Sequence, residues 1–187
     1  MKFTECSLAG AYVVEAEPIK DERGFFARVW CRQEFQRLGL CALIEQSSVS
    51  FNERRGTLRG MHFQVSPHEE VKVVRCTQGS IHDVIVDLRA ESPTYCQWFA
   101  MELSAQNGKM MYVPPGFAHG FQTLSDRSEV FYQISEAYHP DSARGVRWND
   151  PAFGIEWPIP QPFLSTRDRR FPDFFSSLST ASARVEA

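Results

Sequence analysis

Short segments in which apolar and polar residues alternate run through most of the chain, separated by proline and glycine. This alternation predicts β-strands, because successive side chains of a strand point to opposite faces of a sheet. The candidate strands are residues 12–16, 25–29, 44–50, 57–64, 97–103, 110–113, 120–124 and 129–135. Residues 71–76 and 81–88 flank a Gln78-Gly79 turn and are predicted to form a β-hairpin. Many short strands with few helices favour a sandwich or barrel, and a double-sheet jelly roll fits the length best.

One segment has a clear helical pattern. Residues 32–38 place Phe35 and Leu38 on the same side of a short amphipathic helix, and Gly39 is a suitable residue to end it. Residues 140–172 are rich in Trp, Pro and Asp, so we expect them to form an ordered irregular wrap with a little helix.

The composition is typical of one globular domain. The chain has 187 residues, of which 43% are hydrophobic and 23% charged. We expect a single domain over residues 1–175 and a flexible tail over residues 176–187, which are small and polar. The net charge of -3 argues against a general nucleic-acid binder, which would carry a basic surplus.

The apolar runs and the cysteines bear on the cellular location that we expect for the protein. No apolar run approaches the ~20 residues that cross a bilayer, so we expect no membrane association. The first residues lack the apolar stretch of a signal peptide. The five cysteines are odd in number and contain no C-x-x-C pair, which makes a disulfide framework or a zinc knuckle a poor interpretation. Reduced thiols in a cytoplasmic protein are predicted.

The first motif that could carry chemistry is R-G-T-L-R-G-M-H-F-Q, residues 55–64. On a regular strand His62 shares a face with Gly60, whereas Arg59 lies on the other face. Gly60 is expected to leave room for a ligand against the backbone. A histidine that is simply hydrogen-bonded within a sheet is the alternative for His62 taken alone.

The second motif is P-P-G-F-A-H-G-F, residues 114–121. Its P-x-G-x-x-H spacing resembles the second motif of cupins, a jelly-roll superfamily in which this histidine enters the barrel mouth. The first cupin motif usually supplies His-x-His as metal ligands, but here Gln64 follows His62 at that spacing. His68, His82, Glu69 and Glu70 have no spacing that favours them as substitutes, so no metal site is predicted.

Lys72 and Tyr132 each allow two interpretations. A lysine among valines usually projects to solvent, but inside a barrel its ammonium would stabilise a developing oxyanion. Tyr132 is either a core tyrosine with a satisfied hydroxyl or a proton donor. The pattern of either strand leaves both possibilities open.

Five motifs together resemble the dTDP-4-dehydrorhamnose 3,5-epimerase family. They follow the family's order and spacing from about residue 2 to residue 174. The motifs are D-E-R-G-F-F (21–26), G-T-L-R-G-M-H-F-Q (56–64), P-P-G-F-A-H-G-F (114–121), R-W-N-D-P (147–151) and S-T-R-D (165–168).

The resemblance implies an all-β, double-stranded β-helix (a cupin-like jelly roll) with a few short helices, no metal or other cofactor, and a homodimer. Family members epimerise a nucleotide-diphosphate-linked 4-keto-6-deoxyhexose at C3, C5 or both. His62 matches the general base and Asp168 its carboxylate partner. Tyr132 matches the proton donor on the opposite face of the sugar, and Lys72 the group that stabilises the enolate oxygen.

These residue types suit the chemistry. A C–H bond next to a ketone is acidic because its anion is an enolate, so the C4 oxygen needs a cation such as Lys72. A histidine titrates near neutral pH, and inversion requires a second acid on the other face. The resemblance also assigns substrate contacts to Arg23, Phe26, Gln46, Arg59, His119, Tyr138 and Arg167. Among these, Tyr138 is expected to stack on the nucleobase, and arginines suit the diphosphate.

Three positions depart from the family pattern. Arg28 replaces a glutamate, Ser48 replaces an asparagine that contacts the base, and Ala143 replaces a glutamate. The catalytic set is complete while these nucleotide-side contacts differ. Our hypothesis is that the reaction type is kept and that the nucleotide or the sugar differs from thymidine diphosphate-4-keto-6-deoxyglucose.

Other functions remain as alternatives. Within the same chemistry these are a mono-epimerase acting at C3 or C5, and an epimerase of a GDP- or CDP-linked keto sugar. A non-catalytic sugar-binding cupin would tolerate loss of Tyr132, Lys72 or Asp168, but all three are present. A metal-dependent oxygenase would bring a second histidine after His62, where Gln64 stands.

Overall fold

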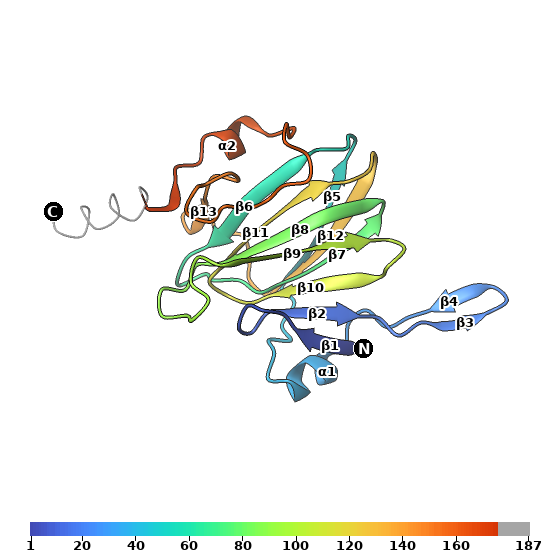
Figure 1. Cartoon of the computed structure of the whole chain (residues 1–187). Coiled ribbons are helices and arrows are strands. Elements are labelled where there is room, and N and C mark those ends of the chain that lie inside the picture. The colour runs from blue at the N-terminus through green and yellow to red at the C-terminus, as the bar shows by residue number, and fades with distance from the viewer. Residues whose placement is uncertain (176–187) are drawn as a thin grey trace.

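The computed structural model describes residues 1–175, which form two antiparallel β-sheets and a separate hairpin (Figure 1). The six-stranded sheet contains, in spatial order, β1 (Lys2–Glu5), β2 (Tyr12–Glu15), β10 (Lys109–Val113), β7 (Lys72–Gln78), β12 (Ser128–Ile134) and β5 (Gln46–Asn52). The five-stranded sheet contains β13 (Ala143–Gly145), β6 (Leu58–Gln64), β11 (Phe117–Thr123), β8 (Ser80–Asp87) and β9 (Trp98–Ser104). This confirms the predicted cupin-like jelly roll. The predicted flexible tail, residues 176–187, lies outside the described residues.

The main core lies between the two sheets. Val74 and Val130 of the six-stranded sheet pack with Ile85 and Phe121 of the five-stranded sheet, all of them nearly inaccessible to solvent. Removing this apolar surface from water is the main force that holds the sheets together.

The C-terminal segment covers the outer face of the five-stranded sheet. Val84 and Val86 of β8 pack there against Phe153, Ile155 and Phe174. Residues 140–172 therefore form the expected irregular wrap, which contains the short strand β13 and one turn of helix, α2 (Thr166–Arg169). The wrap buries β8 on both faces, which explains why valine or isoleucine occurs on each of them.

The helix α1 (Arg32–Arg37) matches the predicted helix to within one residue and lies against the six-stranded sheet (Figure 1). Gly39 has φ +70° and its N–H binds the carbonyl of Gln36, as expected for a residue that ends a helix. The expected pairing of Phe35 with Leu38 is wrong. Phe35 packs instead against aromatic rings of the sheet and its loops, whereas Leu38 is exposed. Neither helix of residues 1–175 has the length and apolar character needed to cross a membrane.

The predicted hairpin of residues 71–76 and 81–88 is also wrong. β7 pairs with β10 and β12, whereas β8 pairs with β9 and β11 in the other sheet. The chain passes from one sheet to the other at Gly79, where φ is +74° and a Cβ would lie 2.6 Å from the Ser125 hydroxyl. A tight glycine turn between two apolar strands fits either arrangement, so the sequence pattern could not tell them apart.

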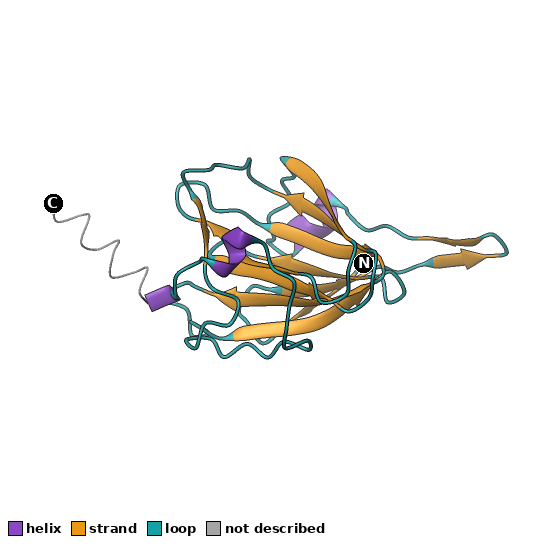
Figure 2. Cartoon of the chain, turned by 90° about the horizontal axis from the view of Figure 1, so that it is seen from above, coloured by secondary structure: helices purple, strands orange, loops and turns teal. Residues whose placement is uncertain are grey.

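β3 (Ile19–Asp21) and β4 (Gly24–Phe26) form an arm that projects from the body of the molecule, as Figures 1 and 2 show. The strand predicted over residues 25–29 is therefore shorter than expected. Ile19 and Phe26 are each 73% exposed, and Phe25 is 69% exposed. Three large apolar side chains on one small arm are not covered by the chain that carries them.

Candidate active site

A β-bulge in β6 shapes the centre of the candidate site. His62 lies opposite His119 of β11, but Arg59 lies opposite Phe121, so Gly60 and Met61 together face the single residue Gly120. The extra residue turns Arg59 and His62 toward the same cavity, and the prediction that they lie on opposite faces is wrong. A Cβ on Gly60 would lie 2.6 Å from the Gly120 Cα. The room that Gly60 was expected to leave for a ligand is therefore taken by β11.

A cavity of about 310 Å³ opens between the two sheets. Its walls come from both sheets, and five of the predicted site residues lie on them. The lining residues are Ser48, Ser50, Arg59, His62, Lys72, His119, Tyr132 and Ile134. The jelly roll thus brings together residues that are far apart in the sequence.

His62 is paired with Asp168. Its Nε2 lies 2.8 Å from Oδ1 of Asp168, which α2 carries behind the cavity wall. Burial alone would raise the pKa of Asp168, but the hydrogen bond and the positive charge that His62 can carry lower it further than burial raises it. An ionised carboxylate only accepts hydrogen bonds, so Nε2 carries the proton and Nδ1 of His62 is the free basic nitrogen.

The backbone around Asp168 is held in place by the same short helix. The Ser165 hydroxyl accepts the backbone N–H of Asp168 and caps α2. The side chain of Asp168 is 6% exposed and that of His62 is 41% exposed. The pair therefore has one buried, fixed partner and one partner that a substrate can reach.

Lys72 points into the cavity, which resolves the two interpretations of its strand. It is 8% exposed, and its Nζ lies 2.5 Å from Oε1 of Glu70 and 3.4 Å from the carbonyl of His62. Glu70 keeps the buried ammonium paired and fixes its direction. Sequence reasoning considered Glu70 only as a metal ligand. An acid two residues before the lysine, just ahead of β7, was the available signal for this pair.

Tyr132 lies in the cavity wall with its ring edge-on to His119, at a centroid distance of 5.9 Å. Burial raises the pKa of its phenol well above the ordinary value, and the charge of Asp83 raises it further. The hydroxyl is therefore protonated at neutral pH and can serve as an acid.

His119 belongs to a second histidine–carboxylate pair. Its Nε2 lies 2.8 Å from Oδ1 of Asp83, and both side chains are almost completely buried. Asp83 was not predicted as a site residue. The signal was an acid within the apolar run of β8, where a buried carboxylate needs a partner.

A neighbouring cleft of about 200 Å³ shares His62 and Lys72 with the cavity. It brings in three more of the predicted contacts, Gln46, Tyr138 and Arg167. The side chain of Tyr138 is 55% exposed at the rim of this cleft. An elongated ligand could occupy the cavity with one end and the cleft with the other.

Arg23 and Phe26 are not brought to this site within one chain. Both lie on the projecting arm, where Arg23 pairs with Asp21 and Phe26 lies beside a separate hollow with Arg28 and Glu34. The monomer thus places nine of the eleven predicted site residues around the cavity and its cleft, or directly behind their walls in the case of Asp168.

Comparison with known proteins agrees with the family resemblance of the five motifs. The family model described as dTDP-4-dehydrorhamnose 3,5-epimerase matches residues 5–176. A dTDP-4-dehydrorhamnose 3,5-epimerase from Salmonella typhimurium is 42% identical over 182 residues, which are 96% of this chain and 99% of that protein.

Two solved structures are similar throughout. The dTDP-4-dehydrorhamnose 3,5-epimerase from Bacillus anthracis, with TDP and PPi bound, superposes with a TM-score of 0.90 at 41% identity and covers 92% of this chain and 99% of its own. NovW, a 4-keto-6-deoxy sugar epimerase from Streptomyces spheroides, superposes with a TM-score of 0.92 at 31% identity and covers 97% of this chain and 91% of its own.

Proposed function

The chain belongs to the dTDP-4-dehydrorhamnose 3,5-epimerase family and is an isomerase, and we propose that it inverts C3, C5 or both in a nucleotide-diphosphate-linked 4-keto-6-deoxyhexose. The observation that carries the proposal is a single cavity lined by a tyrosine, a buried lysine and a histidine that is paired with an aspartate behind the wall. These are a base, an oxyanion partner and an acid, which are the three groups that epimerisation next to a ketone requires.

His62 removes the proton. Its free Nδ1 takes a proton from the carbon next to the C4 ketone, and the electron pair of the broken C–H bond forms the C=C bond of an enolate. Asp168 accepts the Nε2–H of His62 and stabilises the imidazolium that results. Asp168 thus acts on the base and holds its tautomer.

Lys72 receives the charge that moves to the C4 oxygen. Its ammonium is almost completely buried, so its interaction with an enolate is screened less than it would be in water. Glu70 holds this ammonium in place in the free protein. A donor that needs no rearrangement during the reaction lowers the barrier more than a mobile one.

Tyr132 returns a proton to the opposite face of the sugar ring. Its O–H bond breaks, a C–H bond of inverted configuration forms, and the enolate becomes the ketone again. The resulting phenolate takes a proton from solvent, and His62 releases its proton to solvent. The chain therefore needs no redox partner for the cycle.

The nucleotide end is assigned to the cleft. Arg59 and His119 contact the sugar and diphosphate, Arg167 adds a cation at the cleft, and Tyr138 offers an exposed ring to the base. Gln46 lies in the same cleft.

We assign Arg23 and Phe26 to a second copy of the chain. The arm projects from the body and leaves Phe26 73% exposed, so a homodimer in which each arm reaches the partner's cleft would cover its apolar residues and add Arg23 to the diphosphate contacts. Light scattering should then give the mass of a dimer, and Phe26→Ala should shift it toward the monomer. A wild-type monomer at assay concentrations would contradict this assignment.

The nucleotide or the sugar is proposed to differ from that of the common family substrate. Ser48, which lies opposite Tyr132 on β5, is a short hydroxyl where the family has an amide, and Arg28 is paired with Glu34.

We also infer a cytoplasmic location, because all five cysteines are free thiols.

The decisive experiment follows the C3 and C5 protons of a 4-keto-6-deoxy sugar nucleotide by NMR in deuterated water. Exchange at both positions supports 3,5-epimerisation, and exchange at one position supports a mono-epimerase. Thymidine-, guanosine- and cytidine-linked sugars are compared at equal concentration, and equal turnover of the thymidine-linked sugar at ordinary family efficiency would count against an altered nucleotide. Absence of exchange with all three would overturn the catalytic assignment.

A further inference from the structure

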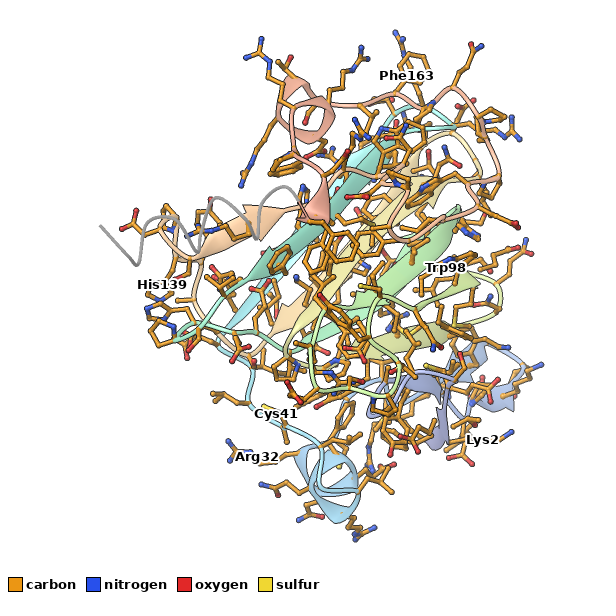
Figure 3. The ribbon with its side chains drawn as sticks, turned by 60° about the vertical axis from the view of Figure 1, so that its left-hand side comes forward. Lys2, Arg32, Cys41, Trp98, His139 and Phe163 are labelled. Carbon is orange, nitrogen blue, oxygen red and sulfur yellow. The ribbon has the colours of Figure 1, made fainter. Side chains whose placement is uncertain are left out.

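His68, Glu136 and His139 form a cluster at the edge of the molecule, apart from the base and the acid. Each offers one ligand atom, and these atoms all lie within 4.8 Å of one another. Among residues 1–175 this is the only such group of three. Figure 3 labels His139, which lies at the outer margin of the molecule.

A buried glutamine fixes the two segments that carry the cluster. The side-chain amide of Gln64 donates hydrogen bonds to the carbonyls of His68 and Ala137, at 3.0 and 3.1 Å. Its carbonyl accepts the backbone N–H of His139 at 2.7 Å. Gln64 is 4% exposed and uses all three bonds for this purpose. The backbones of His68 and His139 therefore keep their separation without any help from their side chains.

The three side chains have few other partners. The imidazoles of His68 and His139 stack with 3.4 Å between their centroids, and Nε2 of His139 lies 3.6 Å from Oε1 of Glu136. No lysine or arginine among the described residues forms an ion pair with Glu136, whose Oε1 otherwise accepts only the N–H of Ala137. Two facing imidazoles beside one carboxylate offer donor atoms and negative charge, with no cation to neutralise them.

We propose that His68, Glu136 and His139 bind a divalent cation of the zinc class. Two imidazoles with one carboxylate form a ligand set that zinc uses with a water in the fourth position, whereas magnesium and calcium prefer oxygen ligands alone. Tetrahedral coordination requires ligand atoms about 3.4 Å apart, as bond lengths of about 2.1 Å imply. The stacked rings must turn about their side-chain bonds to direct both lone pairs at one point. The half-exposed positions of these side chains leave room for that rotation.

The site has a consequence for the cleft, and this step rests on the proposed function. Tyr138 lies between Glu136 and His139 in the sequence, and Glu70, which pairs with Lys72, follows His68 by two residues. A cation would join the β6–β7 connection to the segment after β12. It would thus restrict the motion of the rim that holds Tyr138, and we expect a lower KM for the nucleotide sugar with little change in kcat.

The test measures zinc binding to the full chain after chelator treatment, by calorimetry at neutral pH. We expect one cation per chain in wild type. The double variant His68→Ala/His139→Ala should lose at least about 100-fold in affinity and Glu136→Gln at least about tenfold, because each removes ligands from the cation. Glu91→Gln, which removes an exposed carboxylate elsewhere, should bind as wild type does. No stoichiometric binding, or undiminished binding by the double variant, would overturn the proposal.

A second readout needs only the wild-type protein, so it stands even if the double variant fails to fold. Zinc should shift the ring NMR signals of His68 and His139 and leave those of His62 and His119 in place. Shifts at His62 or His119 alone would assign the cation to the cavity and refute the site. Since neither measurement uses turnover, a protein that binds zinc here but shows no epimerisation would leave the site standing and refute only the proposed function.

Discussion

Replacing Asp168 with asparagine tests the base most directly. The substitution keeps the shape of a side chain that is 6% exposed, and the cap from Ser165 to the backbone N–H of residue 168 is retained. It removes the carboxylate that lies 2.8 Å from Nε2 of His62. The charge that stabilises the imidazolium is therefore lost, while the fold should be preserved.

The size of the effect follows from the geometry. Because Asp168 is buried but His62 is 41% exposed, we use an effective dielectric constant of about 40, between the values of about 20 for protein sites and about 80 for water. Two unit charges 2.8 Å apart then interact by about 3 kcal/mol. Losing this interaction in the transition state corresponds to a decrease in kcat on the order of 100-fold.

The assay is solvent deuterium exchange into the sugar under saturating substrate. Circular dichroism and a thermal melt of Asp168→Asn provide the control for folding, and Asp173→Asn provides a matched change at an acid outside the cavity. A folded Asp168→Asn protein whose kcat stays within twofold of wild type would refute the role of the pair.

Three further predictions concern single side chains. Tyr132→Phe should stay folded and invert the sugar at least about 100-fold more slowly, while exchange at the base-facing side partly persists, because only the acid is removed. Tyr12→Phe on the same sheet should behave as wild type. Inversion by Tyr132→Phe at the wild-type rate would exclude the tyrosine as the acid. Lys72→Met should lower kcat by about 10²- to 10³-fold, as loss of an oxyanion donor does. Lys109→Met is the matched control. An unchanged kcat in Lys72→Met would show that Lys72 has no part in the mechanism. Asp87 has a pKa lowered to about 2, since hydrogen bonds from Arg89, Ser92 and Thr94 outweigh the effect of burial. Its folded-state pKa lies below the unfolded value, so its contribution is present above about pH 4 and is lost as the pH falls toward 2. Asp87→Asn should therefore cost about 2 kcal/mol in urea unfolding at pH 7 and much less near pH 2; a cost that does not vary with pH would contradict this assignment.

The sequence predicts the strands well because each carries its own alternation. The strand over residues 129–135, for instance, differs from β12 by one residue at each end. The pairing of strands depends on residues that are distant in the sequence, so it is harder to predict from the sequence. The turn at Gly79 illustrates the limit, because a glycine with positive φ serves a hairpin and a crossing between sheets equally well.

Site residues within one local motif can be predicted from the sequence. Contacts between residues that only folding brings together are harder to predict. His62 and Asp168 are 106 residues apart, and their pairing came from the family resemblance, since no spacing connects them. The bulge that turns Arg59 toward His62 depends on the contact between Gly60 and Gly120, which only the packed sheet reveals. Asp83 lies hidden in an apolar strand, and its role becomes visible only with His119 beside it.

The two sheets can form before all of the C-terminal wrap does, whereas the pair of His62 and Asp168 is complete only after the wrap has folded. A ribosome adds residues from the N-terminus onward, so every strand of the six-stranded sheet exists before residue 168 is made. Both sheets, which carry His62, Lys72 and Tyr132, can thus form before Asp168 has docked beside His62. Full proton-transfer activity should appear only once the wrap has docked onto the outer face of β8.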